Sequence, residues 1–203
     1  MKSSAGLAAL LAGEQSAMTL AAAASKASVK AAGFRAPLES DPHELTFMQW
    51  PARAAIYGGQ RELEAVRSKI ALIAQSIAKF EPVVVLARAD QTDTAAKVLG
   101  SGIAVWPIPT DDLWCRDAGP TFVLSRDGRM AVSDLGFNGW GGKQSHADDE
   151  LIARRVANQL KLPLFANGIV GEAGGVEVDG AGTALAHEGS GINKNGTKQG
   201  KAL

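Results

Sequence analysis

The sequence has little cysteine and no net charge, and both properties exclude classes of protein. Its 203 residues include one cysteine, Cys115, so an internal disulfide and a multi-thiolate metal site are both excluded. Lysine and arginine total 21, as do aspartate and glutamate, and a neutral chain has no broad field to attract nucleic acid or anionic lipid. No uninterrupted apolar run reaches about 18 residues, the length that a membrane span needs. We therefore expect neither a nucleic-acid partner nor a membrane partner.

The composition is that of a globular protein, with one unusual segment at its start. Hydrophobic residues make up 46% of the chain and charged residues 21%, which suffices for a core in one or two domains. Residues 1–32 contain twelve alanines and no aromatic residue. We interpret them as either a degenerate export signal or an alanine-rich leader, which leaves both cytoplasmic and exported locations open. A folded domain is expected over 33–190, followed by a polar, frayed tail over 191–203.

Hydrophobic spacing predicts helices that alternate with strands. Apolar residues recur every three or four positions over 60–80, which predicts an amphipathic helix. A continuous apolar run at 83–86 follows Pro82 and predicts a buried strand. A short helix over 94–99 and a strand over 103–108 are expected next.

Two hairpins and one more helix are predicted in the second half of the chain. The segments 121–124 and 130–133 flank an Asp-Gly turn, and 176–178 and 183–186 flank another. A helix is expected between these hairpins, over 148–160. This succession of strands, hairpins and helices predicts an α/β fold made of structural repeats.

The densest group of reactive side chains lies at 111–120, directly after a predicted strand. Three aspartates, Trp114 and Arg116 fall within seven residues. Carboxylates accept paired hydrogen bonds from a guanidinium, and an aromatic face stacks on such a planar cation. The residues alone also allow a structural interpretation, in which Arg116 pairs with a neighbouring aspartate and Trp114 fills the core. We keep both interpretations at this point.

Two further segments carry glycines beside functional side chains. Along a strand, Glu177 and Asp179 are two residues apart and face the same side, so both carboxylates could enter one cavity. The alternative is a hairpin turn at Asp179 with a solvated Glu177. Glycines surround Trp140 in the segment 137–143, which indicates a loop packed closely against another part of the protein or over a pocket. The three histidines lack metal-binding spacing, so no metal is expected.

Taken together, these blocks resemble one family. The segments 112–121, 137–143 and 172–180 are similar to successive blocks of agmatine deiminases and bacterial-type peptidylarginine deiminases. The segments 33–37 and 42–51 are similar to the start of the same family's domain. The order of the blocks makes the resemblance specific, and it covers the N-terminal portion of the family's longer chains.

The resemblance implies a partial pentein fold, an α/β propeller built of ββαβ modules around a polar site. It also implies a cofactor-free hydrolase that converts a guanidinium group to urea and ammonia, as in agmatine-dependent putrescine biosynthesis. By that resemblance Asp117 and Asp179 hold the guanidinium and Trp114 lines the pocket. Asp112 and Glu172, in the same blocks, are expected to bind the substrate as well.

Two positions depart from the family pattern. Glu177 stands where the family has a proton-shuttling histidine, so we expect Glu177 to act in catalysis, with His187 as the alternative proton carrier. The family's nucleophilic cysteine lies near the C-terminus of chains longer than this one, and no residue here matches it. Cys115 occupies a variable position in its block and is not expected to replace it.

The sequence therefore predicts a deiminase-family hydrolase in truncated form. The substrate would be a small guanidino compound, either agmatine or an arginine side chain, and the chain's activity by itself is left open. The alternatives are a non-catalytic module that binds guanidino cations and an inactive truncated product. Because a partial propeller leaves strand edges uncovered, association into a homo-oligomer is also considered.

Overall fold

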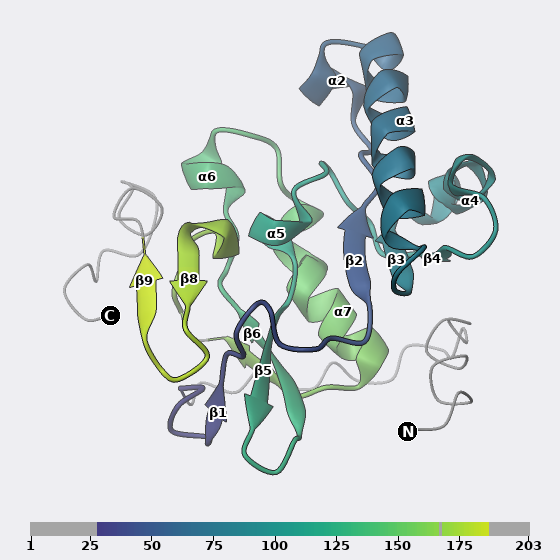
Figure 1. Cartoon of the computed structure of the whole chain (residues 1–203). Coiled ribbons are helices and arrows are strands. Elements are labelled where there is room, and N and C mark those ends of the chain that lie inside the picture. The colour runs from purple at the N-terminus through teal and green to yellow at the C-terminus, as the bar shows by residue number, and fades with distance from the viewer. Residues whose placement is uncertain (1–27, 167, 187–203) are drawn as a thin grey trace. The chain divides into compact units, whose positions relative to one another are not determined.

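A computed structural model describes residues 28–166 and 168–186 (Figure 1). Most of the expected leader and the whole expected tail, together with His187, lie outside the described residues. The described residues divide into two compact units, one containing His43–Leu113 and the other containing residues 28–42, 114–166 and 168–186. We describe each unit by itself.

The unit containing His43–Leu113 is built on a parallel sheet of three strands in the order β2-β3-β4. The strands are β2 (Thr46–Gln49), β3 (Val83–Leu86) and β4 (Ala104–Trp106). Helices α2 (Ala54–Tyr57) and α3 (Gln60–Ile77) connect β2 to β3, and the short turn η1 (Ala89–Gln91) with α4 (Thr92–Leu99) connects β3 to β4 (Figure 1). All four residues of β3 are fully buried, and each such aliphatic side chain contributes about 1.5–3 kcal/mol to the core.

Helix α3 buries most of the expected apolar stripe, since Leu63 and Ile70 are buried and Val66 and Ile77 pack against the core. The buried positions are Leu63, Arg67, Ile70, Ala71 and Ala74, whereas Ile73 is 48% exposed. The guanidinium of Arg67 lies 5.4 Å from the Trp50 ring centroid, and its Nε donates to the Pro51 carbonyl. The small alanines allow close packing on that face. The predicted helix also ends at Ile77 rather than at residue 80, and Phe80 is exposed.

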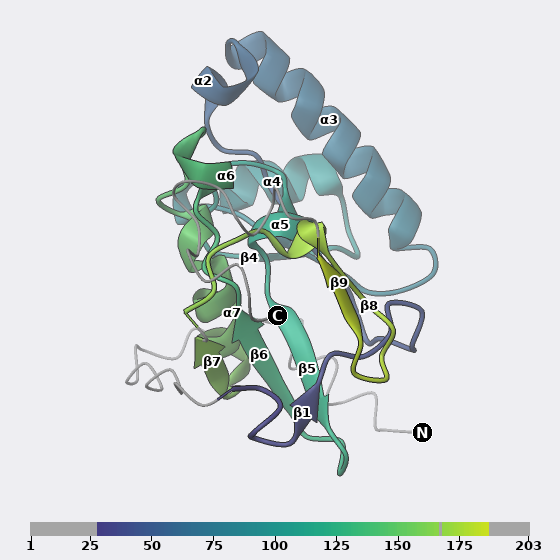
Figure 2. The same ribbon diagram turned by 90° about the vertical axis from the view of Figure 1, so that its left-hand side faces the viewer.

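The second unit contains a four-stranded sheet in the order β1-β5-β6-β7. These strands are β1 (Phe34–Arg35), β5 (Thr121–Ser125), β6 (Met130–Asp134) and β7 (Leu164–Ala166). The β5–β6 hairpin is antiparallel, and β6 pairs in parallel with β7 after a crossover through η2 (Asp149–Leu151) and α7 (Ile152–Leu160). Figure 2 shows α7 lying along this sheet. The succession β5-β6-α7-β7 is thus one ββαβ arrangement.

The remaining elements of this unit are short. They are α5 (Cys115–Ala118), α6 (Gly139–Gly142), the turn η3 (Ala173–Gly175) and the antiparallel hairpin of β8 (Val176–Val178) and β9 (Ala184–Ala186). Both predicted hairpins are confirmed, as is the predicted strand at 83–86. The described residues form a mixed α/β fold, in which none of the helices has the length and apolarity required to cross a membrane.

Candidate functional site

Asp117 lies at the centre of the candidate site in the second unit. It belongs to α5, the single helical turn that begins after Trp114, and its backbone N–H bonds to the Trp114 carbonyl at 3.1 Å. Its carboxylate accepts a hydrogen bond from the Trp140 indole and another from the Gly174 backbone N–H. Three segments far apart in sequence therefore meet at one carboxylate, and two of these contacts were not predicted.

The environment of Asp117 disfavours its own negative charge. Partial burial raises the pKa of this carboxyl above its usual value, while the hydrogen bonds from Trp140 and Gly174 and the charge of Arg116 oppose the shift. The guanidinium of Arg116 is engaged elsewhere in an ion pair with Glu39. Asp117 is therefore a carboxylate that a further cation would stabilise.

Gly174 is required here because it allows the backbone to approach Asp117. A Cβ atom at Gly174 would overlap Asp117 Oδ1, although the backbone conformation itself accepts other residues. We expect Gly174→Ala to displace the carboxylate and break its bond to Trp140, which would move the Trp140 indole N–H resonance in an NMR spectrum.

Gly128→Ala in the β5–β6 turn is the matched control for this substitution. A methyl group there meets open space, but φ is +82°, so we expect a stability cost of about 1 kcal/mol. The Trp140 resonance should not move in the control. An unchanged resonance in Gly174→Ala would contradict the close approach.

The aromatic rings of Trp114, Trp140 and Phe137 pack against one another, and the Trp140 ring contacts Asp117. The Trp114 and Trp140 ring centroids are 6.4 Å apart with planes at 90°, and those of Phe137 and Trp140 are 5.0 Å apart with planes at 87°. Such edge-to-face pairs are a favourable arrangement of aromatic rings. Phe137 is buried, whereas Trp114 is 50% exposed. Trp114 therefore does not fill the core, and its exposed indole surface is accessible to a ligand.

The loop that carries Trp140 has an unusual backbone. Trp140 has φ 55° and ψ 46°, and the three glycines of α6 around it also have positive φ. A left-handed conformation is rare for a bulky residue and costs about 1–3 kcal/mol. Asn138 holds the turn, because its side chain accepts a hydrogen bond from the Gly141 N–H at 2.8 Å. The expectation of a closely packed, glycine-rich loop is confirmed, because a Cβ at Gly139 would lie 2.5 Å from His146 Nδ1.

Glu172 precedes η3 and lies two residues from Gly174. Its Oε2 atom is enclosed by protein and has no hydrogen-bond partner among the described residues. Burial of a carboxylate oxygen without a partner is unfavourable. This oxygen is a second acceptor, and it belongs to the residue two positions before the Gly174 that contacts Asp117.

Glu177 and Asp179 occupy the β8–β9 hairpin, where Glu177 is exposed. Asp179 Oδ1 accepts hydrogen bonds from the backbone N–H groups of Ala181, Gly182 and Thr183 at 2.8, 3.0 and 2.9 Å. The hydrogen bond from the Thr183 side chain, followed by these backbone bonds, lowers the pKa of Asp179 to about 2. Asp179 therefore caps its own turn in the described structure, and its expected role in guanidinium binding stays a prediction.

Along the chain, strand β8 lies between the Gly174 contact of Asp117 and the position of Asp179. Asp117 contacts Gly174 before β8, and Asp179 follows the far end of the same strand. A strand rises by about 3.3 Å per residue, so roughly 10 Å of strand lies between these two positions. Among the described residues no contact joins Asp117 to Asp179 or to Glu177.

Asp112 belongs to the other unit and is 1% exposed. Its Oδ1 accepts a hydrogen bond from the Leu113 backbone N–H at 2.7 Å and another from the Tyr57 hydroxyl. Its neighbour Asp111 is also buried and pairs with Arg53. These contacts are those of a structural polar cluster, and the expected substrate contact of Asp112 stays a prediction.

Cys115 lies next to the candidate site but is a poor nucleophile. Burial and the charge of Asp149 raise the pKa of its thiol to about 12, against a smaller opposing effect of Arg116. The thiolate is the reactive form of cysteine. At neutral pH this residue is therefore a thiol.

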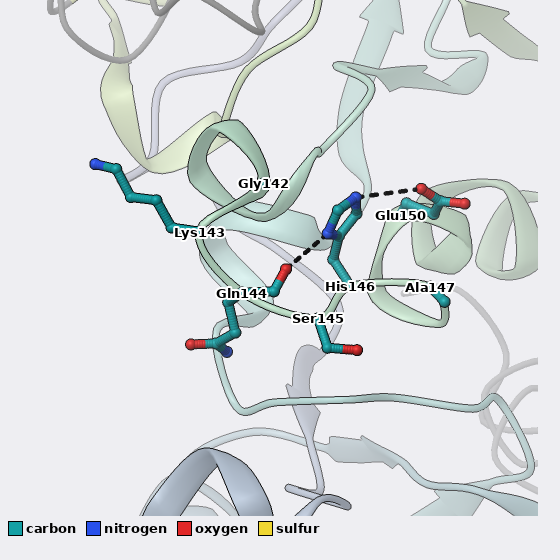
Figure 3. Close-up of a pocket in the computed structure, with 7 residues that line it drawn as sticks. All are labelled: Gly142, Lys143, Gln144, Ser145, His146, Ala147 and Glu150. Atoms are coloured by element: carbon teal, nitrogen blue, oxygen red, sulfur yellow. Dashed lines mark hydrogen bonds and ion pairs between the residues drawn. The ribbon is translucent and has the colours of Figure 1, made fainter.

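A surface hollow is lined by residues 142–147 and Glu150 (Figure 3). His146 Nδ1 lies 2.8 Å from the Gln144 carbonyl, and Nε2 lies 3.6 Å from Glu150 Oε2. Across the parts of the chain that the structure describes, no three histidine, cysteine or acidic side chains are grouped as metal ligands would be.

Comparison with known proteins places these features in a family. Residues 35–201 match the family model of the Porphyromonas-type peptidyl-arginine deiminase. The chain belongs to this family. An agmatine deiminase of Pseudomonas aeruginosa is 37% identical over 175 residues, which are 82% of this chain and 46% of the relative. The resemblance inferred from the motif blocks is confirmed.

Solved deiminase-family structures match the fold. An agmatine deiminase of Enterococcus faecalis aligns with a TM-score of 0.77 and 29% identity, covering 83% of this chain and 47% of that one. A substrate-bound agmatine deiminase of C. jejuni aligns with a TM-score of 0.64 at 20% identity, covering 76% of this chain and 46% of that one. The expected α/β class is thus confirmed, and the chain spans about half the length of the deiminases it matches.

Proposed function

We propose that the chain supplies the guanidinium-holding part of an amidine hydrolase of the deiminase family. The substrate would be agmatine or an arginine side chain, and the reaction would convert its guanidinium to a urea with release of ammonia. The observation that carries this proposal is Asp117, a partly buried carboxylate with a raised pKa, held between Trp140 and Gly174.

The chemistry of the ligand fits these groups. A guanidinium keeps its charge at any neutral pH and presents a planar fork of donors to a carboxylate. Asp117 and the enclosed oxygen of Glu172 supply acceptors, and the exposed indole of Trp114 supplies an aromatic face. Fixed carboxylates neutralise the cation before a nucleophile attacks its central carbon. Asp112, Asp179 and the proton-transfer role of Glu177 enter the proposal from the family resemblance alone.

We also propose that the fold is part of a pentein propeller. The support is the succession β5-β6-α7-β7, which has the order of one ββαβ module. A propeller would place such modules around a shared polar site, and the remaining modules would complete the pocket.

The raised pKa of the Cys115 thiol favours a second candidate function. In the proposed reaction a thiolate forms a bond to the guanidinium carbon, ammonia leaves, and water then releases the urea and the thiol. Cys115 is the single cysteine of the chain, and its pKa of about 12 leaves almost no thiolate at neutral pH. This observation favours a module that binds guanidino cations without turnover.

A pair of ligands matched in shape but different in charge tests the proposal. Butylguanidine and butylurea have nearly the same shape, but only the first is a cation. We expect calorimetric titration of the full chain to show butylguanidine and agmatine binding at least tenfold more tightly than butylurea, since a charged hydrogen bond is worth about 1.5–3 kcal/mol. Equal affinities, or no binding of agmatine at millimolar concentration, would exclude the guanidinium site.

Ammonia release from agmatine separates the two candidate functions. The proposed hydrolase releases ammonia, whereas a binding module does not. The same assay on Cys115→Ala shows whether any turnover uses this thiol, and we expect none to do so. Turnover that disappears in Cys115→Ala would contradict the assignment of Cys115 as unreactive.

A further inference from the structure

We propose that His146 is a positioning residue that holds the left-handed turn of α6 and thereby places the Trp140 indole on Asp117. The functional consequence rests on the proposed guanidinium site, whereas the positioning itself does not. His146 belongs to none of the motif blocks that carry the family resemblance.

The imidazole contacts the turn directly. Its Nδ1 lies 2.8 Å from the Gln144 carbonyl, and because a carbonyl only accepts, Nδ1 carries the proton and donates it. Figure 3 shows the ring between this carbonyl and Glu150, with Gly142 and Lys143 on the loop above it. The hydrogen bond thus fixes the ring against the segment that follows the turn.

Gly139, the first residue of the turn, rests on the same ring. The Cβ position of Gly139 lies 2.5 Å from His146 Nδ1 and 2.9 Å from its Cγ, so the glycine backbone and the imidazole are in close contact. The Phe137 and His146 ring centroids are 6.3 Å apart with planes at 83°. His146 therefore packs against Phe137 and Gly139, which precede Trp140 in the sequence.

These contacts oppose relaxation of a strained residue. Trp140 has φ 55°, and a bulky side chain leaves that region unless its surroundings hold it. Its neighbours Phe137 and Gly139 rest on His146, and its indole N–H bonds to Asp117. A continuous series of contacts therefore runs from the His146 ring through the turn to the Asp117 carboxylate.

Two substitutions separate the hydrogen bond from the ring. His146→Phe keeps an aromatic ring but removes the donor to Gln144, and His146→Asn keeps a short donor and removes the ring. We expect His146→Phe to shift the Trp140 indole N–H resonance and to weaken agmatine binding about tenfold, the effect of losing one hydrogen bond at a partly buried group. In His146→Asn the Trp140 resonance should lie closer to its wild-type position than in His146→Phe, and agmatine affinity should be partly recovered.

Glu150→Gln is the matched control. It removes the charge that lies 3.6 Å from Nε2 but leaves the Gln144 contact intact, so the Trp140 resonance and agmatine affinity should stay at wild-type values. If His146 had only a structural role, its substitution would lower thermal stability without moving the Trp140 resonance. A wild-type resonance in both His146 variants would overturn the proposal.

The NMR measurement needs no ligand, so it distinguishes the two proposals. If the wild-type chain fails to bind agmatine, the proposed function is wrong, while the Trp140 resonance still decides the role of His146. If His146→Phe does not fold, the smaller His146→Asn variant provides the same test, because loss of the ring should still move the Trp140 resonance.

Discussion

Asp117→Asn is expected to weaken agmatine binding by about 100-fold, because truncating one partner of a buried charge pair costs about 2–5 kcal/mol. The same substitution should raise the melting temperature of the unliganded chain. Burial raises the pKa of Asp117, so the folded state holds its carboxylate charge at a cost when no cation is bound. Asparagine keeps an acceptor for Trp140 and Gly174 without that charge. The melting temperature of Asp117→Asn, measured without ligand, should therefore lie above that of the wild-type chain.

The pH dependence of binding provides an internal check. Agmatine binds the ionised carboxylate, so wild-type affinity should fall as pH decreases through the raised pKa of Asp117, and Asp117→Asn should lose that dependence. Asp127→Asn is the control, since Asp127 is an exposed aspartate of the β5–β6 turn paired with Arg129. Unchanged agmatine affinity in Asp117→Asn, measured by calorimetry, would remove Asp117 from the site.

Cys115 is expected to react with an aromatic disulfide reagent about a thousand times more slowly than an ordinary thiol at pH 8. The thiolate is the reacting species. Raising a thiol pKa from 9.0 to about 12 lowers the thiolate fraction at pH 8 by about three powers of ten. The absorbance of the released aromatic thiolate measures the rate.

The unfolded chain is the control for that measurement, because the same thiol in guanidinium chloride should react at an ordinary rate. Reaction of the folded chain at that ordinary rate would restore Cys115 as a candidate nucleophile.

The raised pKa of the Cys115 thiol also has a consequence for stability. The folded state retains the thiol proton more tightly than the unfolded state, so this group stabilises the fold below about pH 9 and less as pH rises toward 12. The Cys115→Ala variant should therefore lose less stability than the wild-type chain between about pH 9 and pH 12.

The sequence was sufficient to predict strands and turns whose formation depends mainly on their own residues. The apolar run of β3 and the Asp-Gly turn between β5 and β6 both lie where the sequence indicated. Strand β2 was not predicted, because Thr46–Gln49 has no regular alternation and depends on its pairing with β3. The burial of Arg67 could not be predicted either, since it depends on Trp50 lying opposite that face of α3.

The candidate site was predicted as separate sequence blocks but not as an arrangement. Asp117, Trp114 and Glu172 were identified from residue type and family resemblance, and all three belong to one unit. The bond from Trp140 to Asp117 and the close approach of Gly174 involve residues 23 and 57 positions away in sequence, so spacing carries no signal for them. The glycines around Trp140 were the one available indication that its backbone is unusual.

The β8–β9 ribbon has only three residues in each strand, and all of β9 is exposed. A two-stranded ribbon of this length is marginally stable by itself, so its main local restraints are the Asp179 turn bonds and the Arg35 bond to the Gly180 carbonyl at 2.5 Å. Such segments open more readily than the sheets beside them. Glu177 would therefore sample many orientations, and in the proposed catalytic role part of the binding free energy would be used to select one of them.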